Sequence, residues 1–140
     1  MRKSLAAGTG LLAILTTVAG TASAAQAAST AYPTAPYEAP YGATYTKGTI
    51  TFYNRAAMVD GVQRALETSG CRQTIAKSYS GSTLLDTTYS QVTCYSKSEE
   101  VHLYVNADVV GGATSVRVSL NNVASDGTVT ELAWDSVPRP

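Results

Sequence analysis

Apolar and polar residues alternate along most of the chain after residue 70, which is the pattern of half-buried β-strands. We predict strands at about 72–79, 84–95, 100–110, 114–123 and 128–134, and a short strand at 48–53. Residues 55–69 carry apolar side chains at helical spacing, which predicts one helix that ends at Gly70. The spaced residues are Val59, Val62, Ala65 and Leu66.

Turn residues between the predicted strands set the register. Gly111-Gly112 suits a two-residue hairpin turn, and residues 125–127 suit a three-residue one. Counting outward from these turns pairs Val105 with Val118, Leu103 with Leu120, Ala107 with Val116, Leu120 with Leu132, and Val118 with Trp134. A four-residue turn at 96–99 pairs Cys94 with Val101. All these side chains then share one buried face. We therefore predict an α+β domain, with a single helix packed on one face of a four- to five-stranded antiparallel sheet.

The first residues have the three parts of a secretory signal peptide. A basic start, Arg2-Lys3, precedes an apolar stretch at 5–19 and then small residues with two small-x-small cleavage sites at 22–27. The apolar stretch is shorter than the roughly 20 residues of a membrane-spanning helix. We assign residues 1–28 to this leader and expect a secreted protein with no transmembrane anchor after processing.

Export to an oxidising compartment predicts that Cys71 and Cys94 form a disulfide bond. Closing that loop stabilises the fold by roughly 3 kcal/mol in the chain-entropy model. Two free reactive thiols are the alternative, although no CxxC motif favours it.

Residues 29–46 are rich in Pro, Ala and Tyr, and we predict a flexible extended arm there. Tyrosines recur in it at positions 32, 37, 41 and 45. Three interpretations stay open: an arm that folds on a partner, a substrate for tyrosine cross-linking, and a simple tether. The compact domain is then predicted to span residues 47–137.

Charge and composition exclude several classes of function. Lys plus Arg and Asp plus Glu number 10 each, and loss of Arg2 and Lys3 with the leader makes the chain slightly acidic. An acidic chain does not hold nucleic acid by bulk positive charge. One His and two Cys exclude zinc fingers and His-rich metal sites, and no glycine-rich phosphate loop precedes a helix. We therefore expect no cofactor and no metal.

The single histidine, His102, lacks a catalytic partner in the predicted register. Its expected cross-strand neighbours are Thr93 and Asn121, and Asp108 lies about 20 Å away along the same strand. No carboxylate then orients the imidazole, and no GxSxG motif is present. Paired carboxylates keep a glycosidase-like hydrolase open as a hypothesis, and the candidates are Asp86, Glu99, Glu100, Asp108 and Glu131.

The outer face of the predicted sheet carries residue types that are common at binding surfaces. We predict Tyr89, Tyr95, His102, Tyr104 and Arg117 as binding residues, against the alternative of an ordinary solvated sheet face. Arg117 is expected to pair with Asp108 or Asp135.

These features predict a small secreted binding protein that is not an enzyme, with an inhibitor of an extracellular hydrolase as the leading candidate. It would act through the outer face or through the hairpin tip at Gly111-Gly112. Its partner would be another extracellular protein or a cell-surface component. The first alternative is a cell-envelope or matrix protein tethered through the Tyr/Pro arm, and the second is a small secreted hydrolase.

Overall fold

The fold is a β-sandwich. The computed structural model describes residues 31–140, so the predicted leader at 1–28 and the first two residues of the predicted arm lie outside the described residues. The strands are β1 (Thr34–Tyr41), β2 (Thr44–Phe52), β3 (Ala56–Arg64), β4 (Cys71–Ser80), β5 (Thr83–Tyr89), β6 (Ser98–Asn106), β7 (Ser115–Val123) and β8 (Val129–Pro138). None of the described segments is a helix able to cross a membrane.

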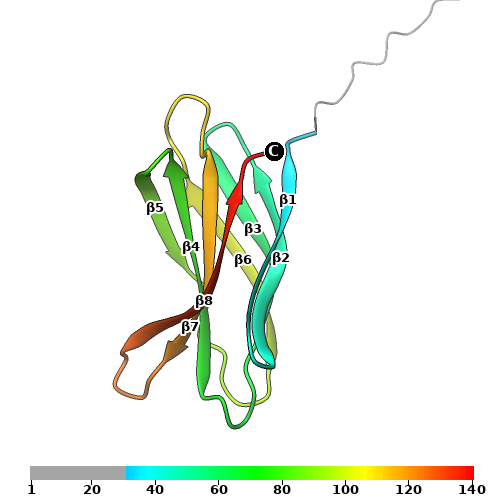
Figure 1. Cartoon of the computed structure of the whole chain (residues 1–140), viewed down its shortest axis with the longest axis vertical. Helices are drawn as coiled ribbons and strands as arrows, with labels where there is room; N and C mark the ends of the chain where they lie inside the picture. Colours follow the sequence, from blue (N-terminus) through cyan, green and yellow to red (C-terminus); the bar gives the residue numbers. More distant parts are fainter. Residues whose placement is uncertain (1–30) are drawn as a thin grey trace, which may run out of the picture.

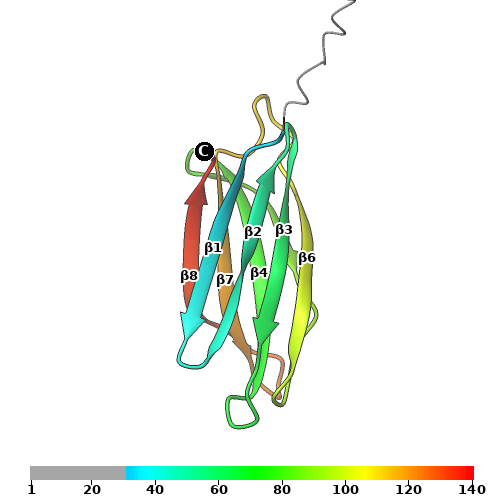
Figure 2. The ribbon, with the colours of Figure 1, turned by 90° about the vertical axis from the view of Figure 1, so that its right-hand side faces the viewer.

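The strands form two antiparallel sheets packed face to face (Figures 1 and 2). Sheet A has the order β1-β2-β3-β6, and sheet B has the order β5-β4-β7-β8. The chain crosses between the sheets after β3, after β5 and after β6. The predicted α+β fold with a single helix on one sheet is therefore wrong, because residues 31–140 contain two sheets and no helix.

Residues 55–69, predicted as the helix, form β3 and the turn that follows it. Every second side chain here points into the core: Ala57, Val59, Gln63 and Ala65 are at most 1% exposed. The apolar residues thus fit a period of two as well as the helical spacing. Pairing of β3 with both β2 and β6 decides between the two, because tertiary contacts override weak local propensity.

The predicted flexible arm also differs from the structure, because residues 34–41 form an edge strand of sheet A. The backbone N–H of Glu38 points away from β2 and donates to Asp135 Oδ2 at 3.1 Å. Pro36 and Pro40 lie two residues to either side, so their nitrogens also face away from β2. No hydrogen bond of the sheet is lost at either proline, and the compact domain begins with β1.

The predicted hairpin between β6 and β7 is wrong as well. β6 pairs with β3 in sheet A, whereas β7 pairs with β4 and β8 in sheet B. Leu103 and Val105 therefore meet Val116 and Val118 in one core from opposite sheets. The alternation identified the buried residues, but it contains no information on which strand lies beside which.

Trp134, predicted on the buried face, lies opposite Ser119 and is 55% exposed. Near the β7–β8 turn the predicted register holds, since Val123 lies opposite Val129. A bulge after Leu120 then shifts the pairing by one residue. A slip of one residue moves each following side chain to the other face.

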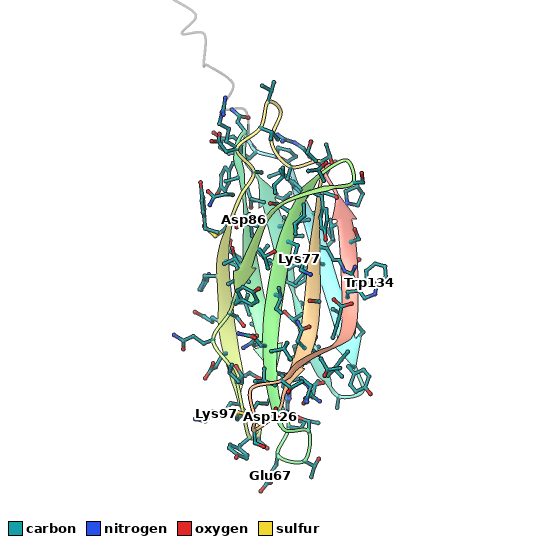
Figure 3. The ribbon with its side chains drawn as sticks, turned by 90° about the vertical axis from the view of Figure 1, so that its left-hand side faces the viewer. Glu67, Lys77, Asp86, Lys97, Asp126 and Trp134 are labelled. Atoms are coloured by element: carbon teal, nitrogen blue, oxygen red, sulfur yellow. A yellow bond between two sulfur atoms is a disulfide. The ribbon has the colours of Figure 1, made fainter. Side chains whose placement is uncertain are left out.

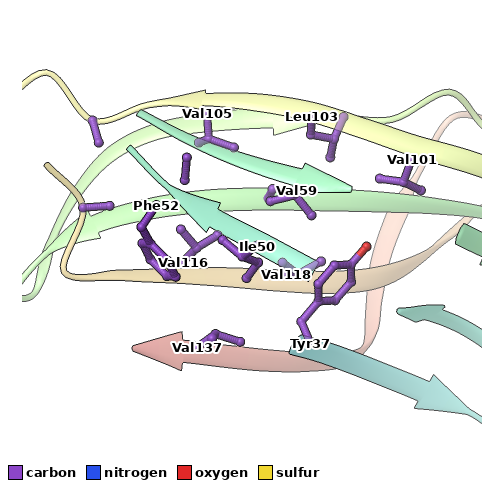
Figure 4. Packing of buried hydrophobic residues seen from close by; sticks show 14 residues of the cluster. Tyr37, Ile50, Phe52, Val59, Val101, Leu103, Val105, Val116, Val118 and Val137 are labelled. Atoms are coloured by element: carbon purple, nitrogen blue, oxygen red, sulfur yellow. The ribbon is translucent and has the colours of Figure 1, made fainter. Parts of the chain in front are cut away.

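The core lies between the two sheets (Figure 4). Ile50, Phe52 and Val59 from sheet A pack against Val116 and Val118 from sheet B, and all five are fully buried. Burial of each such side chain contributes about 1.5–3 kcal/mol.

Cys71 and Cys94 form a disulfide bond, which confirms that prediction. It joins the first residue of β4 to the segment that connects β5 and β6. Two backbone hydrogen bonds between Arg72 and Thr93, at 2.7 and 2.8 Å, fix the same junction. Cys94 does not lie beside Val101 as predicted, because Val101 pairs with β3.

Side chains close both lateral openings of the sandwich. The Glu38–Asp135 contact joins β1 to β8. Between β5 and β6, Asp86 Oδ2 accepts from the backbone N–H of Asn106 at 2.8 Å. The Thr88 hydroxyl donates to the backbone carbonyl of Tyr104 at 3.1 Å. These contacts occupy edge groups that would otherwise be free to pair with a strand of another chain.

Candidate functional site

The five predicted binding residues are divided between opposite surfaces. His102 and Tyr104 lie on β6, on the outer face of sheet A, whereas Arg117 lies on β7, on the outer face of sheet B. Tyr89 ends β5, and Tyr95 lies in the segment between β5 and β6. The division follows from the placement of β6 and β7 in different sheets.

Tyr89 and His102 nevertheless come together where β5 adjoins β6. They line an open groove of about 440 Å³ whose other lining residues are Ser90, Gln91, Glu99, Glu100 and Leu103. Tyr104 is on the same edge strand and is 54% exposed.

His102 has carboxylate partners that the predicted register missed. Its Nδ1 lies 2.7 Å from Asp60 Oδ1 on β3, and its Nε2 lies 3.3 Å from Glu100 Oε2. The hydrogen bond to Asp60, and next the one to Glu100, raise the pKa of the imidazole above its ordinary value. The sequence pattern predicted that Asp60 lies on a helix. Because β3 is a strand, Asp60 lies directly opposite His102 on the neighbouring strand.

This arrangement favours the doubly protonated imidazolium, which donates from both ring nitrogens. A hydrolytic triad needs the reverse: a neutral imidazole with one nitrogen free to take a proton from a hydroxyl or thiol. Around His102, that nitrogen faces Glu100. In the described residues His102 therefore has the geometry of an exposed charge cluster rather than of a general base.

A second candidate site is the loop between β6 and β7, which projects beyond the strand ends (Figure 2). The N–H of Gly112 donates to the carbonyl of Val109 at 2.9 Å, which closes a four-residue turn. Gly111, at the third position, has a φ of +85°, as a type II turn requires. Val110 occupies the tip and is 95% exposed.

Several contacts hold this tip loop, residues 109–112, in place. Arg139 Nη1 donates to the carbonyl of Gly111 at 2.7 Å, and Arg55 forms an ion pair with Asp108 at the base of the loop. A Cβ atom at Gly112 would lie 2.6 Å from the carbonyl oxygen of Asn54, so the loop backbone rests directly on the β2–β3 turn.

Both ends of the tip loop are anchored in the core. Ala107 is 0% exposed and Ala113 is 1% exposed. An aromatic pair lies at the same end of the molecule, where Tyr32 meets Tyr53 edge-on with ring centroids 4.7 Å apart. The sequence signal for this loop was the Gly111-Gly112 turn, which places glycine at two positive φ angles.

Arg117 has a different partner from those predicted. Its Nη2 lies 2.5 Å from Glu131 Oε1, and the central carbon of its guanidinium lies 4.3 Å from the ring centre of Trp134. Asp108 pairs with Arg55, and Asp135 binds β1.

An open groove of about 580 Å³ lies over Gly48 and Gly61. Glu38, Lys47 and Asp135 contribute charges of both signs to its lining.

No family model, curated protein or solved structure matches the chain. Residues 31–140 also contain no group of three His, Cys, Asp or Glu side chains suited to hold a metal ion.

Proposed function

We propose that this protein is an exported binding protein without catalysis of its own, and that it inserts the tip of the β6–β7 loop into an apolar pocket of another extracellular protein. An inhibitor of an extracellular hydrolase acts in this way. The observation that carries the proposal is the exposure of the Val110 side chain, 95%, on a loop whose backbone is fixed at several points.

Rigidity matters because a flexible loop loses conformational entropy when it binds, whereas a loop already held in its bound form does not. The contacts of Arg139 and Asp108 and the buried anchors at Ala107 and Ala113 hold the tip loop before any partner arrives. An aliphatic side chain on such a loop loses contact with water when it enters a pocket, and that burial supplies affinity.

The predicted leader and the disulfide support an extracellular setting. The tether alternative has less support, because residues 34–41 of its arm belong to sheet A. The hydrolase alternative also has less support, because His102 lies between two carboxylates.

The test is an inhibition assay against secreted serine, cysteine and metallo-endopeptidases and glycoside hydrolases. The variants are Val110→Asp and, as a matched control, Val129→Asp, which makes the same change at an exposed valine beside the β7–β8 turn. We expect the wild type and Val129→Asp to inhibit at least one enzyme equally. Val110→Asp should weaken that inhibition by about thirtyfold or more. Inhibition that survives in Val110→Asp would contradict the role of the tip loop.

A further inference from the structure

A second surface, independent of the tip loop, surrounds Trp134 at the β8 edge of sheet B (Figure 3). We propose that this surface binds a neutral saccharide, with one sugar ring stacked on the Trp134 indole. The inference concerns a different face of the molecule and does not depend on the proposed inhibitor function.

The indole is both exposed and fixed. Trp134 is 55% exposed, and the guanidinium of Arg117 lies 4.3 Å from its ring centre. Arg117 is itself held by an ion pair with Glu131 at 2.5 Å, which fixes the guanidinium against the indole. A cation over the ring restricts the motion of the indole, and this lowers the entropic cost of binding a flat ligand to the exposed part of the ring.

The surroundings of the indole are hydroxyl-rich. Trp134 and Arg117 line an open groove of about 380 Å³ together with Tyr79, Ser82, Ser115 and Ser136. A groove of this size is at the lower end of the usual range for small-molecule sites, about 300–1,000 Å³. It has room for a short stretch of a chain molecule that continues along the surface.

The chemistry of the lining favours a sugar over other ligands. A pyranose ring has a face of C–H groups, which stacks on an aromatic ring, and a rim of hydroxyls, which exchange hydrogen bonds with serine and tyrosine hydroxyls. Arg117 is the one charged residue that lines the groove, and its charge is paired with that of Glu131. Hot spots for binding another protein are desolvated positions that surrounding contacts shield from water. Serines form the rim of this groove, which is therefore less suited to a protein partner than to a sugar.

The test uses the one tryptophan of the chain as its own reporter. Cello-, chito- and xylo-oligosaccharides, all of them neutral, are each titrated into the protein while tryptophan emission is recorded. We expect a saturable change in emission with at least one of them. Arg117→Ala, which removes the stacked cation but leaves the reporter, should weaken that response by about tenfold.

Retention on the matching insoluble polysaccharide completes the test, because it does not require tryptophan. Trp134→Ala should lose retention, whereas Tyr104→Ala should keep it, since Tyr104 is 54% exposed but lies on the opposite sheet. Val110→Asp should also keep it. The proposal is overturned if none of the three saccharide classes changes the emission saturably, or if Trp134→Ala is retained as well as the wild type.

Discussion

Gly48 lies directly opposite Gly61 on the neighbouring strand, and neither position has room for a Cβ atom. A Cβ at Gly48 would lie 1.9 Å from the carbonyl oxygen of Asp60, and one at Gly61 would lie 2.2 Å from that of Lys47. The buried phenol of Tyr37 extends to the same place, since its hydroxyl would be 2.5 Å from a Cβ at Gly61. The close approach of β2 and β3 therefore depends on two glycines and one aromatic ring.

We predict that Gly48→Ala lowers the free energy of unfolding by about 3 kcal/mol, because the backbone of β3 has to move. Gly81→Ala is the control: its φ is +60° but a Cβ there meets nothing within 4 Å, so strain of about 1 kcal/mol is the only cost. Urea unfolding of both variants measures the difference. Equal losses would show that the close contact at Gly48 is unimportant.

Gln63 is the centre of a buried polar network between the sheets. Its Oε1 accepts from the N–H and hydroxyl of Thr74 at 2.9 and 2.7 Å and from Ser90 Oγ at 2.8 Å. Its Nε2 donates to the carbonyl of Gln91 at 2.7 Å and to Thr93 Oγ1 at 2.6 Å. All hydrogen-bonding capacity of this buried amide is thus used.

Gln63→Leu should therefore cost about 3 kcal/mol or more of stability, because several buried donors and acceptors lose their partner at once. Gln73→Leu is the matched control, since Gln73 makes one side-chain hydrogen bond, to the carbonyl of Ser90 at 2.9 Å, and should cost about 1 kcal/mol. Thermal and urea unfolding compare the two. A loss at Gln63 no larger than at Gln73 would contradict the structural role of the network.

The disulfide joins residues 23 apart in sequence. The double variant Cys71→Ser/Cys94→Ser should unfold with a free energy lower by roughly 3 kcal/mol, because its unfolded chain regains the freedom that the bond removes. Reductant should destabilise the wild type by a similar amount and leave the double variant unchanged. A wild-type urea midpoint that reductant does not move would contradict this expectation.

His102 should titrate above the ordinary histidine pKa of about 6.5, because its hydrogen bonds to Asp60 and then to Glu100 favour the charged ring. Since the folded pKa is the higher one, this contribution to stability is complete below the unfolded pKa and is lost as the pH rises through the folded pKa. His102 is the only histidine of the chain, so its ring signals can be followed by NMR without assignment.

Asp60→Asn should shift that pKa back toward the ordinary value, since the largest favourable contact is weakened. Asp126→Asn, at the β7–β8 turn (Figure 3), should leave it unchanged, because Asp126 makes no hydrogen bond to the ring. If the wild type and Asp60→Asn titrate at the same pH, the hydrogen bond does not exist in solution.

The sequence pattern predicted local properties well where one strand alone determines them. Alternation identified Leu103, Val105, Val116 and Val118 as buried, and export chemistry predicted the disulfide. Strand partners were wrong because two sheets that bury their inner faces against each other produce the same alternation as one sheet covered by a helix.

The candidate site shows the same limit. The turn at Gly111-Gly112 was visible in the sequence, because positive φ angles favour glycine. The ion pair of His102 with Asp60 was not visible in the sequence, because residues 55–69 fit the period of a helix as well as that of a strand. The exposure of Trp134 was missed through the single bulge after Leu120.

A pull-down from the culture fluid of the producing cells tests most directly whether the tip loop holds the partner. The baits are the mature protein, Val110→Asp, Val129→Asp and the triple variant Tyr89→Ala/Tyr95→Ala/Tyr104→Ala, with bound proteins identified by mass spectrometry. We predict a partner that the wild type, Val129→Asp and the triple variant retain and that Val110→Asp loses. A partner that Val110→Asp retains and the triple variant loses would place binding at the β5–β6 edge and contradict the account.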